Sequence, residues 1–179
     1  MIGIEPKVKG NFFQRIVIFV KKKTGEGGLT KLGLSPDTYV HDRWYPYNEF
    51  CSLLQRTQDL LKDAKTSVAY KLGYETMYGD ERWHAMFKGQ DPKDVFGTNK
   101  RQDALFMVGR FEIMSVSDGR VEVKMSLWSK DESNNRLWAQ FYHGVMQGVM
   151  DITGKHGQVQ MEEAQGAVEK VWLYRMTWN

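Results

Sequence analysis

The side chains of this chain that most readily carry out chemistry are one cysteine and four histidines, His41, His84, His143 and His156. No two histidines have the spacing of a zinc-hydrolase helix, in which residues i and i+4 share one face. A single histidine can still ligate a haem iron or act as a general base, so His41 and His84 are candidates. An ordinary surface or hydrogen-bonded histidine is the alternative for each, and the sequence assigns no role to His41, His143 or His156.

Cys51 is the only cysteine, which excludes an intramolecular disulfide and a zinc site built from several thiolates. It lies near the start of an apolar helical pattern, where a thiol is usually a buried packing group. The chain also contains no glycine-rich phosphate loop and no Gly-x-Ser-x-Gly motif. The sequence therefore predicts no catalytic residue and no metal ligand, and it does not favour an enzyme.

Aromatic side chains offer a different kind of site, an apolar pocket bordered by a few polar groups. Tyr70, Tyr74 and Tyr78 recur every four residues and would share one helix face. Packing in the core is the alternative, because buried rings with polar tips are common there. The predicted ligand-binding residues are Trp44, Tyr45, Tyr47, Tyr70, Tyr74, Trp83, His84, Gly144 and Gly148.

Gly144 and Gly148 belong to this set because they lie four residues apart on one face of an expected helix. A glycine pair allows another group to approach the helix backbone closely. That group could be a strand, a second subunit or a flat ligand. Close packing of this helix on the sheet is the simplest explanation, because glycine in a helix interior costs stability that close packing can offset.

The composition limits the classes of partner. The net charge of +3 comes from 25 basic and 22 acidic residues, so no nucleic-acid partner is expected. The longest apolar runs are far too short to span a bilayer. No secretory signal is apparent between Met1 and Lys9, and we expect a cytoplasmic location.

Hydrophobic periodicity predicts a single α+β domain over residues 1–179. Residues 10–103 are mainly helical, with a first helix that is capped by Asn11 and ends near Gly25, and a second that begins near Tyr47. Residues 104–178 contain a hairpin at Asp118-Gly119, a long helix that begins at Ser133 or Asn134, and two further strands. The expected fold is a helical N-terminal half packed on a four-stranded antiparallel sheet, with the order strand-strand-helix-strand-strand in the C-terminal half.

Several short motifs carry a family resemblance. They are Lys9-Gly10 at the start of the first helix, Trp44-Tyr45-Pro46 at the start of the next, the segment His143-Gly144-Val145-Met146-Gln147-Gly148-Val149-Met150 followed by Gly154, and the strands that end at Trp178. In this order they resemble a family of uncharacterised bacterial domains best populated in myxobacteria. The relatives of that family are the 4-vinyl-reductase, haem-NO-binding and TRAPP vesicle-tethering domains, which share the NO-signalling/Golgi-transport ligand-binding fold.

The resemblance implies a homodimer, an interior that accepts a small apolar ligand, and a sensory or accessory role. It also marks departures from the relatives. Where many 4-vinyl-reductase domains have cysteines, this chain has Trp138, Ala139, Ala164 and Val171. The Tyr-x-Ser-x-Arg pattern of the haem-binding relatives is missing too, so haem, although possible, has no motif behind it and the cofactor stays unassigned.

Three functions follow as hypotheses. The first is a small-molecule-binding sensory or regulatory domain for an apolar or aromatic ligand. The second is a non-enzymatic scaffold or assembly protein that acts through dimerisation, which a tightly packed interior would favour. The third is an accessory enzyme of tetrapyrrole or aromatic metabolism, which rests on fold analogy alone.

Overall fold

The computed structural model describes residues 5–61, 67–97, 106–166 and 170–179. Their N-terminal part is mainly helical, as the sequence predicts. The helices are α1 (Gly10–Lys31), α2 (Tyr47–Leu61), α3 (Val68–Tyr78), α4 (Glu81–Phe87) and α5 (Pro92–Phe96). A small sheet in the order β2-β1-β3 joins this part and was not predicted; its strands are β1 (Lys7–Lys9), β2 (Trp44–Pro46) and β3 (Phe106–Met107).

The C-terminal part confirms the predicted α+β class. Its elements are β4 (Gly109–Ser117), β5 (Arg120–Leu127), α6 (Glu132–Thr153), β6 (Gly157–Gln165) and β7 (Lys170–Trp178). The four strands form an antiparallel sheet in the order β4-β5-β7-β6. Gly119 has a φ of 75° in the turn between β4 and β5, which explains why the Asp118-Gly119 pair forms the hairpin there.

Two helix caps differ from the prediction. Residue Lys9 precedes α1 as its N-cap and makes no side-chain cap, so Asn11 lies inside the helix instead of capping it. The N-cap of α6 is Asp131, because its carboxylate reaches the amide groups of Ser133 and Asn134. The first helix is also longer than predicted, since it continues past a kink at Gly25, where φ is 67°.

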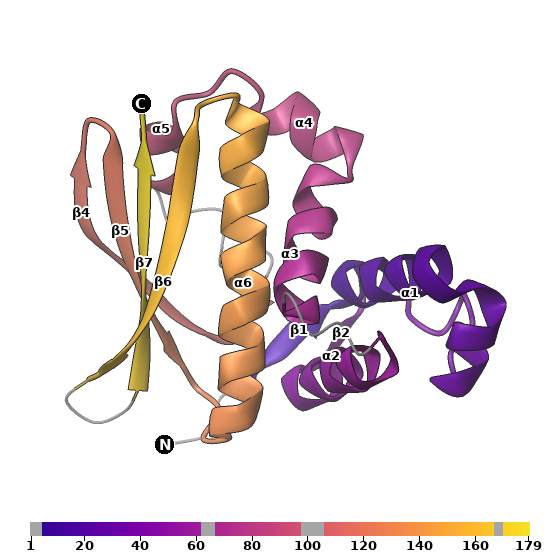
Figure 1. Cartoon of the computed structure of the whole chain (residues 1–179). Coiled ribbons are helices and arrows are strands. Elements are labelled where there is room, and N and C mark those ends of the chain that lie inside the picture. Colours follow the sequence, from indigo (N-terminus) through magenta and orange to yellow (C-terminus); the bar gives the residue numbers. More distant parts are fainter. Residues whose placement is uncertain (1–4, 62–66, 98–105, 167–169) are drawn as a thin grey trace.

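Helix α6 packs against one face of the sheet, and the helical part lies on the far side of α6 (Figure 1). Tyr174 of β7 is fully buried between them and donates a hydrogen bond of 3.0 Å to the carbonyl oxygen of Ala139 in α6. On its other side α6 contributes Trp138 and Phe141 to an aromatic cluster with Phe50 of α2. The long helix is therefore the common wall of two packed layers.

The backbones of α3 and α6 pass very close to each other. A Cβ atom on Gly73 would overlap the carbonyl oxygen of Phe141, and one on Gly144 would overlap the carbonyl oxygen of Tyr70. A Cβ atom on Gly148 would lie 2.9 Å from the carbonyl oxygen of Tyr74. The glycine face of α6 therefore packs against helix α3, and the prediction that it packs on the sheet was wrong. Within the described part of the chain, no helix is long and apolar enough to cross a membrane.

We expect Gly144→Ala to lower the free energy of unfolding by about 1–3 kcal/mol, because the added methyl group forces α3 and α6 apart. The matched control is Gly27→Ala in α1, where nothing lies within 4 Å of the new Cβ atom. This control should be neutral or stabilise by up to about 1 kcal/mol, because alanine is the better helix former. Chemical denaturation measures both values, and equal stability of Gly144→Ala and wild type would contradict the packing account.

Candidate functional site

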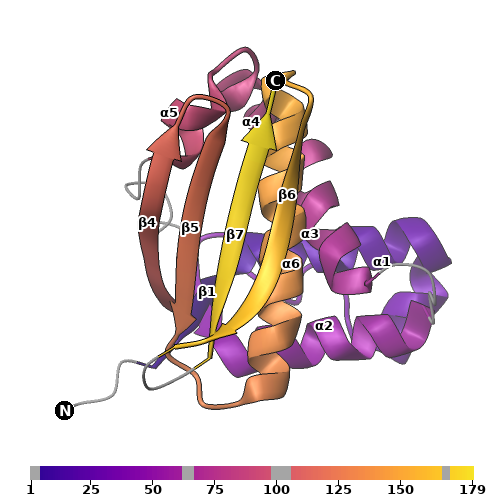
Figure 2. The same ribbon diagram turned by 60° about the vertical axis from the view of Figure 1, so that its left-hand side comes forward.

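One face of the four-stranded sheet packs on α6, and the opposite face, here called the outer face, has no described helix against it (Figure 2). A hollow of about 390 Å³ lies on this outer face. We call it the sheet hollow. Its lining residues are Met114, Glu122, Gln160, Met161, Glu162, Leu173, Tyr174 and Arg175.

Strand alternation decides which of these residues present side chains to the sheet hollow. Tyr174 is buried on the α6 side and pairs in register with Met161, so these two line the hollow through their backbone. Leu173 and Arg175 point outward from β7 on either side of Tyr174. Met114 is 55% exposed and lies within the irregularity of β4, between Ile113 and Ser115. The sheet hollow thus has an apolar floor from Leu173 and Met114.

A fixed cluster of charges borders that floor. Glu122 of β5 accepts hydrogen bonds from Arg120 at 2.6 Å, from Arg175 Nε at 2.7 Å and from Ser115 Oγ at 3.2 Å. These donors, the Arg120 guanidinium first, lower the pKa of Glu122 to about 2. Gln160 lies opposite Arg175 on β6. The site can therefore hold an apolar body against Leu173 while charged and amide groups bind a polar end.

The predicted ligand-binding residues lie in three separate places. The first is the start of α1 and α2. Here Lys9 Nζ lies 5.4 Å from the ring centre of Trp44, and the hydroxyl of Tyr45 accepts a hydrogen bond from the amide of Val40. Tyr47 is buried nearby and its hydroxyl contacts the carbonyl oxygen of Asn134 at 3.1 Å. Burial raises the pKa of the Tyr47 hydroxyl strongly, so it stays protonated.

The second place is the seam between α3 and α6, where Gly144 and Gly148 also lie. Tyr74 donates a hydrogen bond of 2.9 Å to Asp151, and the ring of Tyr70 lies 4.9 Å from that of His143. These side chains are half-buried on the surface of the seam. Their hydroxyl and ring contacts join the two helices.

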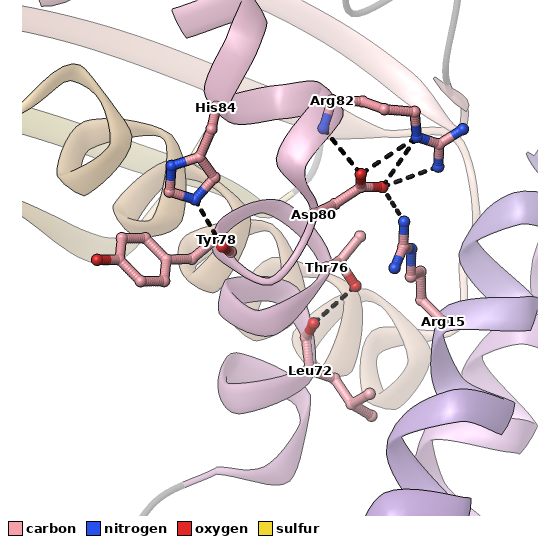
Figure 3. A network of polar contacts seen from close by, with 7 residues as sticks. All are labelled: Arg15, Leu72, Thr76, Tyr78, Asp80, Arg82 and His84. Carbon is pink, nitrogen blue, oxygen red and sulfur yellow. Dashed lines mark hydrogen bonds and ion pairs between the residues drawn. The ribbon is translucent and has the colours of Figure 1, made fainter. Parts of the chain in front are cut away.

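The third place is α4, where Trp83 stacks on Phe87 and His84 approaches Tyr78. Figure 3 shows this region with its central ion cluster. Asp80, which is 7% exposed, caps α4 and binds the guanidinium groups of Arg15 from α1 and Arg82 from α4. Its carboxylate therefore ties α1 to the start of α4, and this cluster holds the helical part together.

A smaller hollow of about 110 Å³ lies between α1 and α3, beside this cluster. It is lined by Arg15, Ile18, Phe19, Lys22, Leu72, Glu75, Thr76 and Gly79. The predicted residues border neither this hollow nor the sheet hollow. The residues of the sheet hollow could not be predicted from the sequence. The alternation of apolar and polar residues shows which side chains face outward from a strand, but not which of them border a hollow.

The structure is similar to that of the unliganded Fe(II) H-NOX protein from K. algicida, with a TM-score of 0.67 and 15% identity over 96% of both chains. It matches a point mutant of the H-NOX protein from T. Tengcongensis with a TM-score of 0.64 and 13% identity, over 96% of this chain and 97% of the other. The chain has the H-NOX fold. No family model and no curated protein matches its sequence.

The H-NOX fold confirms the haem-NO-binding part of the predicted resemblance at the level of architecture. At 11–15% identity, the likeness carries over the arrangement of helices and strands and not the chemistry of a site. The relationship to 4-vinyl-reductase and TRAPP domains stays a prediction.

Haem is the cofactor that the H-NOX fold implies, and the described histidines do not fit it. Nε2 of His143 donates a hydrogen bond of 2.7 Å to the carbonyl oxygen of Val159. Nε2 of His84 donates a hydrogen bond to the carbonyl oxygen of Tyr78. His41 pairs with Asp42 on the surface. His156 lines an open hollow whose other residues are mainly polar, whereas haem needs apolar walls.

Haemin added to the purified protein should therefore give no stoichiometric complex with the absorption spectrum of a histidine-ligated haem. Optical titration at several ratios of haemin to protein measures this, with a haem-binding protein as the positive control. A sharp, saturable Soret band that His84→Ala or His143→Ala removes would contradict the assignment.

The Glu122 cluster predicts a pH dependence of stability. The pKa of Glu122 is lowered to about 2 in the folded chain, so its charged form stabilises the fold above the unfolded pKa of roughly 4.3. That contribution is lost as the pH falls from this value towards about 2. Glu122→Gln should reduce the loss of melting temperature over this window relative to wild type. Identical pH profiles for the two proteins would show that the cluster does not act on stability.

Proposed function

We propose that the chain is a small-molecule-binding sensory or regulatory domain that takes an apolar or aromatic organic ligand in the sheet hollow. The observation that carries the proposal is the apolar floor of Leu173 and Met114 beside the fixed pair of Glu122 and Arg175. Pockets that bind small molecules combine these two features, a largely apolar lining and a few polar groups at set positions. The H-NOX fold supports the sensory role as an analogy.

The charge cluster favours a ligand that also carries a polar end. Arg175 is held by Glu122, so its guanidinium has a fixed direction before any ligand arrives. A group whose position is already set loses less conformational freedom on binding. Gln160 lies beside it on β6 and adds an amide that can donate or accept. The free thiol of Cys51, buried in the core, agrees with the cytoplasmic location that we expect.

A second candidate is a scaffold or assembly protein, and the packing of α6 favours it. The side chains of Phe12, Phe50, Trp138 and Phe141 are at most 1% exposed, and they fill the space between α6 and the helical part. The predicted ligand residues are engaged in this packing or on its surface. The enzymatic alternative has no specific observation behind it among the described residues, where no cluster of three metal-ligating side chains occurs.

Native mass spectrometry of the freshly purified protein tests for a retained organic molecule. A fluorescent apolar probe, anilinonaphthalene sulfonate, then tests the location. Leu173→Glu places a negative charge on the floor of the sheet hollow, which removes apolar contact and repels the sulfonate of the probe. We expect it to weaken probe binding at least about tenfold, or ~1.4 kcal/mol.

Ile18→Glu is the matched control, because Ile18 is 55% exposed and lines the smaller hollow between α1 and α3. It should leave probe binding unchanged. Circular dichroism confirms that both variants fold. If Ile18→Glu weakens binding and Leu173→Glu does not, the probe binds between α1 and α3 and the proposal is wrong. The proposal is also wrong if neither variant changes binding.

A further inference from the structure

The guanidinium of Arg175 has one edge that is engaged and one edge that is open. Its Nε donates a hydrogen bond of 2.7 Å to Glu122, and neither terminal amino group has a partner among the described residues. The side chain is 39% exposed and lines the sheet hollow, so the open edge is accessible. A guanidinium only donates hydrogen bonds, and its planar fork matches the two oxygens of a carboxylate. The open edge of Arg175 is therefore suited to an anion.

The charges around Arg175 leave a positive excess at this end of the sheet hollow. Arg120 and Arg175 both donate to the Oε1 atom of Glu122, so two cations share one carboxylate. Glu122 is ionised at neutral pH, because these donors lower its pKa to about 2. One positive charge of the cluster therefore has no counter-charge, and an anionic ligand supplies it.

Gln160 adds a second open donor beside Arg175. It lies opposite Arg175 in the register of β6 and β7, and both residues line the sheet hollow. Its side-chain amide has no hydrogen-bond partner in the part of the chain that the structure describes. An amide nitrogen can donate to a carboxylate oxygen, as a guanidinium does. Leu173, two residues before Arg175 on the same face of β7, places the apolar floor about 7 Å along the strand from this polar end.

Glu162 gives the apolar end of the hollow the opposite charge. It is exposed and lies opposite Leu173 on β6. Its carboxylate forms no ion pair with a described residue, so its negative charge is not neutralised there. Like charges repel, and the repulsion is strongest at short range. A ligand with its anionic group at Arg175 and its apolar body on Leu173 therefore cannot readily carry a second negative charge on that body.

We infer that the ligand of the sheet hollow is an organic monocarboxylate whose carboxylate binds the terminal amino groups of Arg175 and whose apolar body lies on Leu173. This inference rests on the proposed function, because it assigns the chemical class of the ligand at the same site. Gln160 binds the carboxylate from β6, while Glu122 fixes the guanidinium from β5. Glu162 disfavours ligands with a second acidic group.

Three probes with the same naphthalene ring and different end groups test this class. They are 2-naphthoate, 2-naphthamide and protonated 2-naphthylmethylamine, each titrated into the full chain and followed by nuclear magnetic resonance of the backbone amides. The dissociation constant of 2-naphthoate should be at least about tenfold lower than those of the other two, because only the carboxylate pairs with the guanidinium. Its chemical-shift changes should centre on Leu173 and Arg175.

Substitution of Arg175 tests which residue provides this preference. Arg175→Gln should bring the dissociation constants of 2-naphthoate and 2-naphthamide to within about twofold of each other. Arg175→Lys keeps the charge without the planar fork and should give an intermediate ratio. Arg136→Gln is the matched control, because Arg136 on α6 is also exposed and pairs with a glutamate, Glu163. This control should keep the wild-type preference, and circular dichroism confirms that all variants fold.

Equal binding of the three probes at the sheet hollow overturns the inference and leaves the proposed function standing. Preferred binding of the amine, lost in Glu162→Gln, also overturns it, because the ligand is then a cation. A preference for 2-naphthoate that persists in Arg175→Gln overturns the role of Arg175 and the inference with it. If no probe gives saturable changes at the sheet hollow, both the inference and the proposed function are wrong.

Discussion

The close approach of the α3 and α6 backbones is the constraint on which the rest of the structure depends. Gly73 of α3 and Gly144 of α6 lie where a side chain would overlap the facing carbonyl oxygens. Because α6 is held there, the carbonyl oxygen of Ala139 can accept a hydrogen bond from the hydroxyl of Tyr174 in the sheet. Phe141 can likewise pack on Phe50 of α2. Helix α6 is thereby fixed to both layers at once, and the sheet keeps one face free.

This arrangement explains why the proposed activities lie outside the core. The interior around Trp138 is filled by aromatic rings. The ring of His143 is hydrogen-bonded to the carbonyl oxygen of Val159 in β6. The edge of β6 is closed at that point, since Gln147 also accepts from the amide of Val159. Among the described residues, the surface that the sheet leaves available is its outer face, with Glu122 and Arg175. The proposed ligand site therefore does not depend on haem.

The sequence predicted the features that depend on local rules. Alternation in β5 and the turn at Gly119 located the hairpin, and the Gly144 and Gly148 spacing predicted a close contact on α6. The sheet hollow could not be predicted, because it depends on which strands flank β7 in the sheet. These strands are β5 and β6, and the whole of α6 separates them in the sequence. The helix caps show the same limit at short range. Spacing favoured Ser133 or Asn134 as the N-cap of α6, whereas in the structure the Asp131 carboxylate accepts hydrogen bonds from the amides of those two residues.

The central claim is that a small organic molecule binds on the outer face of the sheet. Its most direct test is the mapping of backbone amide chemical shifts by nuclear magnetic resonance during titration with anilinonaphthalene sulfonate. We expect saturable changes centred on Glu122, Gln160, Leu173 and Arg175, with little change in α1 and α3. Changes centred on Ile18 and Leu72, or a titration without saturable changes anywhere, would contradict it.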